Sequence, residues 1–147
     1  RNVPSLGGEA YRRTIYIQVR RTLPLGVLVP FDLPTLDPNC AQRTFSTNAP
    51  QSLQMMNAPF VLEQVAKFAA RIRLEAGPDL TRQINLAWLM ALGRGPTDIE
   101  AGMAREFMQE QKALRAAAPA GGQNAQTNPL ANLCQALVAS NGFLYVE

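Results

Sequence analysis

The sequence predicts a mainly α protein, a bundle-like domain of four to five helices with an ordered, extended, proline-rich segment packed on it. Apolar residues recur at helical spacing through most of residues 58–147, and helix start and stop signals divide that region into separate helices. Residues 30–57 are irregular, because Pro30, Pro34 and Pro38 each restrict φ and push the preceding residue towards an extended conformation. The helices are therefore expected to form the core, with the proline-rich segment on its surface.

Length and composition point to a single domain. The chain has 147 residues, of which 47% are hydrophobic and 17% charged, enough for one ordinary core. We expect residues 1–57 to hold a helix or strand and a docked irregular segment, and residues 58–147 to hold a helical core with a flexible connector at 117–128. The N-terminal residues resemble the middle of a protein, so a piece of a larger protein is expected. No run of about 18 apolar residues occurs, so no transmembrane segment is predicted.

The charge is uneven, and histidine is absent. The net charge is +3, and residues 1–43 contain six arginines against three acidic residues. The pairs Arg12-Arg13 and Arg20-Arg21 lack interleaved aromatic residues, so a salt-bridged or solvated face is favoured and no nucleic-acid partner is predicted. Without histidine, the chain itself cannot form His-based zinc sites, Ser-His-Asp or Cys-His systems, or a C-x-x-C-H haem attachment. We therefore predict no catalytic residue, metal or cofactor within it.

The N-terminal region has two interpretations. In Tyr11–Thr22 the apolar residues fit both a helical spacing of four and a strand alternation, and the helix is favoured. The following LPLGVLVPF, residues 23–31, is predicted to be extended because it contains two prolines and a glycine. Apolar side chains in the proline-rich segment favour docking on the body: Phe31, Leu33, Leu36, Cys40 and Phe45.

Two helices are expected next. A short helix, capped by Thr47 or Asn48, has Pro50 near its first turn and runs to Met56. Asn57 is expected to cap a longer helix that starts at Pro59 and stops at Gly77-Pro78. Its predicted apolar face consists of Val61, Val65, Phe68 and Ile72, opposite a charged face of Glu63, Lys67, Arg71 and Glu75.

The next two helices differ in their apolar pattern. From Asp79 to Leu92 the sequence is apolar nearly all round, so we predict the central buried helix here, anchored by Trp88 and stopped by Gly93. Thr97-Asp98-Ile99-Glu100 is a capping box that begins another helix, which runs to about Ala116. Its predicted apolar stripe is Ile99, Met103, Phe107 and Leu114.

The C-terminal region is expected to hold one more helix. It starts at Pro129, ends at Asn141-Gly142, and is followed by an extended FLYVE. Its predicted apolar face consists of Leu130, Leu133, Cys134, Leu137 and Val138. The chain's five methionines are expected to fill gaps in the core rather than to bind metal.

The densest polar group on the proline-rich segment consists of Asp32, Asp37, Arg43, Ser46 and Thr47. An arginine among carboxylates and hydroxyls can bind an anion, a sugar hydroxyl or a metal-bound carboxylate. The favoured interpretation is structural: Asp32 and Arg43 pair to fasten the loop, and Thr47 caps the next helix.

Four blocks of the sequence carry a family resemblance: YRRTIYIQVRRTLP, PFDLPTLDPNCAQRTFSTNAPQSLQMMNAPFV, LMALGRGPTDIE and LCQALVASNGFLYVE. In this order they resemble the C-terminal part of the planctomycete-specific domain of unknown function, the PSD-one family. Leu33 departs from an Ala, and Gly142 from a Glu, at the matching positions.

The resemblance implies an exported, periplasmic or cell-surface protein, in which such domains form the C-terminal region, often with a c-type cytochrome-like haem domain elsewhere. The expected function is a non-catalytic structural or interaction module whose partners are other domains or chains of the same protein. Two alternatives stay open: part of a polysaccharide-acting enzyme with Asp32, Asp37 and Arg43 lining a cleft, or an electron-transfer partner surface for the haem domain.

Export would also permit a disulfide between Cys40 and Cys134, the only cysteines. The bridge would close a loop of nearly a hundred residues and contribute about 3 to 5 kcal/mol by chain entropy. The alternative is two buried free thiols.

Overall fold

The computed structural model describes Tyr16, Val29–Phe31, residues 49–117 and residues 128–145, and the chain divides into two units, residues 1–48 and 49–147. In the first unit, Val29–Phe31 forms a turn of 3-10 helix, so the prediction of extended backbone is wrong for these three residues. Pro30 fits either conformation, because its fixed φ of about −65° occurs both in 3-10 turns and in extended backbone. The predictions for Tyr11–Thr22 and the arginine pairs otherwise lie outside the described residues.

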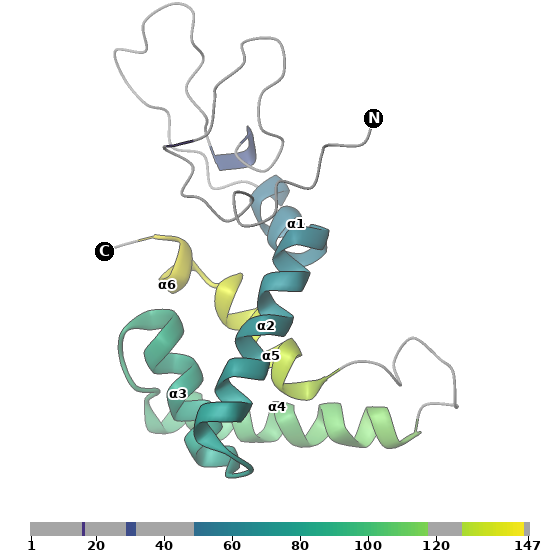
Figure 1. Ribbon diagram of the computed structural model, residues 1–147, viewed down its shortest axis with the longest axis vertical. Helices are drawn as coiled ribbons and strands as arrows, with labels where there is room; N and C mark the ends of the chain where they lie inside the picture. Colours follow the sequence, from purple (N-terminus) through teal and green to yellow (C-terminus); the bar gives the residue numbers. More distant parts are fainter. Residues whose placement is uncertain (1–15, 17–28, 32–48, 118–127, 146–147) are drawn as a thin grey trace, which may run out of the picture. The chain divides into compact units, whose positions relative to one another are not determined.

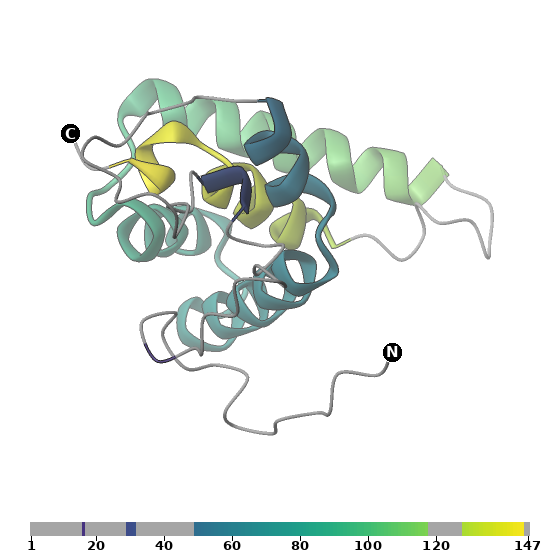
Figure 2. The same cartoon turned by 90° about the horizontal axis from the view of Figure 1, so that it is seen from above.

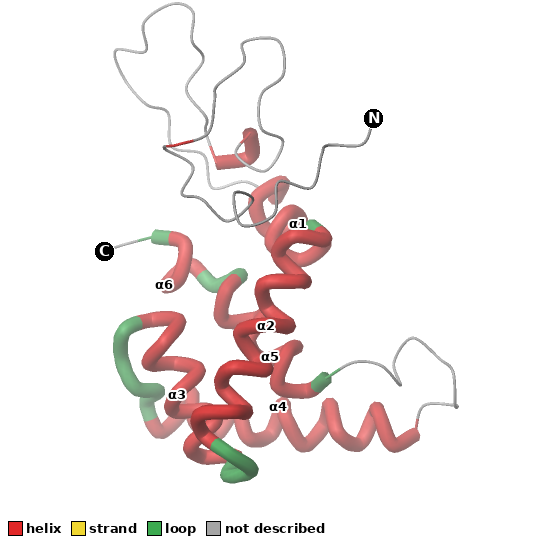
Figure 3. Tube along the Cα trace, viewed as in Figure 1, coloured by secondary structure: helices red, strands yellow, loops and turns green. Residues whose placement is uncertain are grey.

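The second unit is built from helices, and its described residues contain no strand (Figure 3). This confirms the mainly α class, with five longer helices and one of four residues. The end of the proline-rich segment, Ala49–Asn57, is helical rather than extended, in agreement with the short helix that was predicted there. The six are α1 (Ala49–Asn57), α2 (Pro59–Ala76), α3 (Leu80–Leu92), α4 (Asp98–Ala117), α5 (Pro129–Val138) and α6 (Asn141–Leu144).

Helix α2 forms where the sequence predicts it. Pro59 occupies the first turn, where its missing N–H costs nothing, and Gly77 ends the helix at a φ of 69°. The capping role predicted for Asn57 is wrong. Ala58 is the N-cap and provides no side-chain hydrogen bond, while the Asn57 Nδ2 donates to the Leu53 carbonyl at 3.0 Å within α1. Of the predicted apolar face, Val61, Val65 and Ile72 are buried and Phe68 is partly buried.

Helix α3 has the predicted ends but not the predicted central place. Asp79 accepts hydrogen bonds from the amides of Thr81 and Arg82, and Gly93 ends the helix with a φ of 70°. Trp88 is buried, as expected. Leu89, however, has 55% of its surface exposed, so the helix buries one face only. An apolar sequence does not require enclosure when too few neighbours surround the helix.

The central helix is α5. It contacts all five other helices of the unit, and Figure 2 shows it lying between α2 and α4, which have no contact with each other. Leu130 and Cys134 are almost fully enclosed. Asn128, expected in the connector, is instead the N-cap of α5, since its Oδ1 accepts from the Leu130 amide at 3.1 Å. The rest of the connector, residues 118–127, lies outside the described residues.

The apolar stripe predicted for α4 is wrong for three of its four residues, since only Phe107 is partly buried against the core. Ile99, Met103 and Leu114 are 76%, 66% and 60% exposed, whereas Ala104 and Met108 are buried. The buried face is therefore rotated from the predicted one by one residue, about 100° around the helix. Helix α4 contacts α3 and α5 with this side and crosses behind α2 in Figure 1.

The C-terminal end also differs from the prediction. Helix α5 stops at Val138, and Asn141–Leu144 forms α6, so Phe143 and Leu144 are helical rather than extended. The Tyr145 hydroxyl donates to the Gln51 Oε1 at 2.6 Å, which ties the C-terminal end to α1. No described helix is long and apolar enough to cross a membrane.

Candidate functional site

The polar group predicted on the proline-rich segment lies outside the described residues: Asp32, Asp37, Arg43, Ser46 and Thr47. Its favoured role as a loop fastening, and its alternative role in a cleft, both stay predictions. Cys40 is outside the description as well. Cys134 is fully buried, and burial raises the pKa of its thiol to about 12. Whether Cys40 and Cys134 pair therefore also stays a prediction.

One candidate site is an apolar groove of about 410 Å³ at the end of the helical unit that carries α1 and α6. Five helices contribute to it, because α2 runs along one side while α1, α3, α5 and α6 converge on the other. We call this site the apolar groove. It is lined by Met55, Phe60, Val61, Gln64, Val65, Phe68, Arg71, Met90, Ala91, Val138 and Phe143.

Aromatic side chains at the apolar groove are incompletely covered. Phe60 on α2 and Phe143 on α6 are 49% and 44% exposed. Exposed aromatic side chains around a concavity are typical of binding surfaces, since each ring buries a large area when a partner covers it.

The apolar groove also contains an unsatisfied donor. The Nε2 of Gln64 is buried and has no hydrogen-bond partner among the described residues. A buried donor without an acceptor costs about 1 to 3 kcal/mol, so an occupant that offers a carbonyl would recover that energy. The ionisable lining residue, Arg71, is paired with Glu75 at 2.7 Å on the solvent side. The groove is thus suited to binding rather than to proton transfer.

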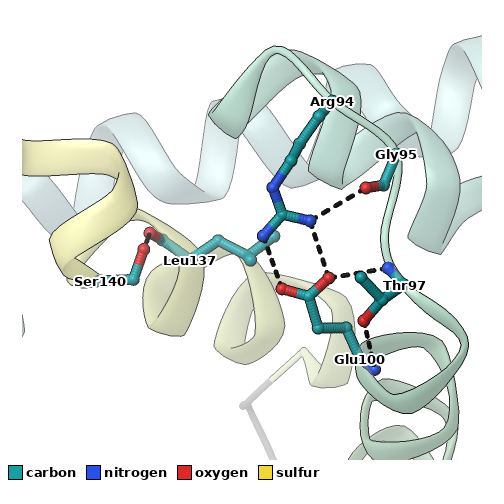
Figure 4. A network of polar contacts seen from close by, with 6 residues as sticks. All are labelled: Arg94, Gly95, Thr97, Glu100, Leu137 and Ser140. Carbon is teal, nitrogen blue, oxygen red and sulfur yellow. Dashed lines mark hydrogen bonds and ion pairs between the residues drawn. The ribbon is translucent and has the colours of Figure 1, made fainter. Parts of the chain in front are cut away.

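A second group of polar residues, Arg94, Thr97 and Glu100, holds the loop after Gly93 in place (Figure 4). We call this hydrogen-bonded group the lock between α3 and α4. Arg94 donates from Nη1 and Nη2 to the two carboxylate oxygens of Glu100, at 2.8 and 2.7 Å, and from Nη1 to the Gly95 carbonyl at 3.0 Å. The Thr97 amide donates to Glu100 at 2.7 Å, and the Glu100 amide donates to the Thr97 hydroxyl at 3.3 Å. The predicted capping box is confirmed.

The lock keeps Glu100 ionised. The hydrogen bond from Arg94, followed by the Thr97 amide, holds the pKa of the Glu100 carboxyl far below its usual value. Sequence reasoning missed Arg94, although an arginine six residues before the glutamate of a capping box is a usable signal. The block LMALGRGPTDIE thus contains a helix stop, an ion pair and a helix start, which together fix the turn between α3 and α4.

A larger groove, of about 780 Å³, lies where the C-terminal ends of α2 and α4 meet the N-terminal ends of α3 and α5. Three of its lining side chains are cationic, Arg73, Lys112 and Arg115, and none is acidic. We call it the basic groove. The sequence could not predict it, because residues 73 and 112 come together only in the folded chain. No group of three or more Cys, Asp or Glu side chains suited to a metal occurs among the described residues.

Comparison with known protein families places the chain. The model of the PSD1 family, described as protein of unknown function (DUF1553), matches residues 2–108. The matched range includes α1 to α3 and about half of α4, and it ends before α5. No curated protein and no solved structure matches the chain.

Proposed function

Because the chain belongs to the PSD1 family of proteins of unknown function (DUF1553), we propose that it is a non-catalytic interaction module whose apolar groove receives an apolar segment from another domain of the same protein. The observation that carries the proposal is the concave apolar surface with half-exposed Phe60 and Phe143. In this proposal the protein is exported and associated with a cytochrome-like domain.

The size and chemistry of the groove support a polypeptide occupant. About 410 Å³ holds a few apolar side chains, not a folded domain, so one inserted segment suffices. Gln64 adds a requirement, because its unpaired Nε2 needs an acceptor inside the groove. A backbone carbonyl of the inserted segment supplies one, while its side chains cover the phenylalanine rings.

The lock between α3 and α4 supports the same role. It fixes the turn that follows Met90 and Ala91, which line the groove from the end of α3. The end of α3 is held by a bidentate ion pair and a capping box, so it loses little conformational entropy when a partner binds. A small entropy loss favours high affinity.

The proposal is tested by photo-crosslinking in the full-length gene product. A photoreactive benzoylphenylalanine replaces Phe60 in one variant and Leu74 in a control. Both residues lie on α2, but Leu74 is 85% exposed and does not line the groove. After irradiation, mass spectrometry identifies the crosslinked peptides.

We expect the Phe60 variant to form crosslinks with apolar peptides of another domain in the same polypeptide, and the Leu74 control to form few. Crosslinks between differently isotope-labelled copies would instead identify self-association and contradict the proposal. Equal crosslinking at both positions would also contradict it.

A further inference from the structure

We propose that the basic groove is a binding site for an organic phosphate, in which a dianionic phosphate group lies among Arg73, Lys112 and Arg115 and its apolar body lies on the floor of the groove. This site is separate from the apolar groove, shares no lining residue with it, and does not depend on the proposed interaction function.

The first support is uncompensated charge. Three cations line one concavity without an acidic lining residue, and like charges gathered in this way repel each other. On other surfaces of the unit three cations pair with carboxylates, Lys67 with Glu63, Arg71 with Glu75 and Arg94 with Glu100, and the described cations without such a pair, Arg82 and Arg105, do not line a groove with other cations. Lys112 and Arg115 form no hydrogen bond or ion pair with another described residue. An anion is therefore the missing counterpart.

The second support is that the positive charge comes from these side chains themselves. Two helices present their N-terminal ends to the groove and two their C-terminal ends, so the helix dipoles largely offset one another. Arg73 uses one donor on the Asn128 Oδ1, at 3.2 Å, which holds its guanidinium at the start of α5. Its remaining donors are available to a ligand, since a guanidinium carries five.

The third support is the shape and polarity of the floor. Three apolar side chains also line the groove: Met108 and Leu130 are buried, and Leu80 is partly buried. A volume of about 780 Å³ lies within the range of small-molecule sites, about 300 to 1,000 Å³, and far exceeds what a bare oxyanion fills. The site therefore suits an anion that carries an apolar body.

The charge of the ligand follows from the number of cations. A single carboxylate leaves two of the three positive charges unbalanced, whereas a phosphate monoester carries a charge of about −1.5 to −2 near neutral pH. Arginine binds such oxygens in a bidentate manner and lysine binds them as a point charge, and both types are present. These properties favour a phosphate monoester over a carboxylic acid.

Isothermal titration calorimetry on the whole chain tests the proposal with three probes: 1-naphthyl phosphate, inorganic phosphate and 1-naphthol. We expect saturable binding of one 1-naphthyl phosphate, weakened by added salt because the cations are exposed. Inorganic phosphate lacks the apolar body, and 1-naphthol lacks the phosphate group. Each should bind at least about tenfold more weakly, because apolar contacts or charged hydrogen bonds are lost.

Matched variants locate the site. The double substitution Lys112→Gln with Arg115→Gln should weaken 1-naphthyl phosphate about tenfold or more. Arg105→Gln removes a charge from an exposed arginine of the same helix that does not line the groove, and should change the affinity less than about twofold. Circular dichroism checks that each variant is folded.

The absence of saturable binding by 1-naphthyl phosphate would overturn the proposal. An equal loss in Arg105→Gln would overturn it too, because it would show attraction to net charge rather than to a site. Inorganic phosphate binding as tightly as 1-naphthyl phosphate would overturn the role of the apolar floor.

Discussion

Helices α2 and α4 are the two longest of the described chain, with 18 and 20 residues, and both carry apolar residues at helical spacing. In α2 the predicted stripe is the one that the fold buries. In α4 the buried residues lie one position away, and the predicted stripe is largely exposed. The same sequence signal was therefore correct in one helix and wrong in the other.

The difference comes from the neighbours of each helix. Helix α2 contacts α1, α3 and α5, and its predicted face, with Val61, Val65 and Ile72, is buried. Helix α4 contacts only α3 and α5 among the described elements, and the small Ala104 lets it approach them closely. Periodicity predicts that a helix has an apolar face, but the surface left open by its neighbours decides which face is buried.

The largest test compares two isoleucines. Ile72 on α2 is fully buried, so Ile72→Ala should lower the free energy of unfolding by about 3 kcal/mol, through lost burial and the cavity left behind. Ile99→Ala on α4 should change it by less than about 0.5 kcal/mol. Urea unfolding of both variants measures the two values. Similar losses would show that the two faces are not as different as described.

A second test stays within α4. Met108 is buried and Met103 exposed, five positions apart on the same helix. Met108→Ala should cost about 2 kcal/mol, whereas Met103→Ala should be nearly neutral, because it loses no enclosed contacts. Thermal and urea unfolding report the difference. A larger loss at Met103 would restore the face predicted from the spacing.

A third test concerns how the two helices begin. Helix α4 has a capping box, whereas α2 begins at Ala58 without a side-chain cap. Thr97→Ala should cost about 1 kcal/mol, since an amide of the first turn loses its acceptor. Thr97→Ser retains the hydroxyl and is the control, expected to stay close to the unsubstituted chain in urea unfolding. Equal losses in both variants would attribute the effect to the threonine methyl group.

The smallest expected effect is a pH dependence at the lock. The pKa of Glu100 is lowered in the folded chain, so its contribution to stability is present above its ordinary value of about 4.5 and is lost as the pH falls below that value. Glu100→Gln should weaken the acid-induced fall in melting temperature. Glu106→Gln, an exposed substitution on the same helix, should leave the fall unchanged. An unchanged fall in Glu100→Gln would contradict the role of the lock.

Local signals predicted most helix ends. Pro59, Gly77, Gly93 and the capping box at Thr97 each act within a few residues of their own position, so the structure confirms them. Asn57 failed because the preceding helix uses it first, as a donor to the Leu53 carbonyl. Competition between adjacent helices for one residue is not visible in the residue type alone.

The two grooves could not be predicted in the same way. Phe60 and Phe143 are 83 residues apart in the sequence (143 − 60), yet both line the apolar groove. Arg73 and Lys112 likewise belong to different helices. The polar group that sequence reasoning did select, from Asp32 to Thr47, lies outside the described residues and remains a prediction.

By itself, the sequence determined the mainly α class, the start and stop of most helices and the capping box from Thr97 to Glu100, because hydrogen bonds between near neighbours decide these features. Only the tertiary structure decided that α5 rather than α3 is central, which face of α4 is buried, and where the two grooves lie. These features depend on how much surface each helix finds covered by the others, and packing between distant segments sets that amount.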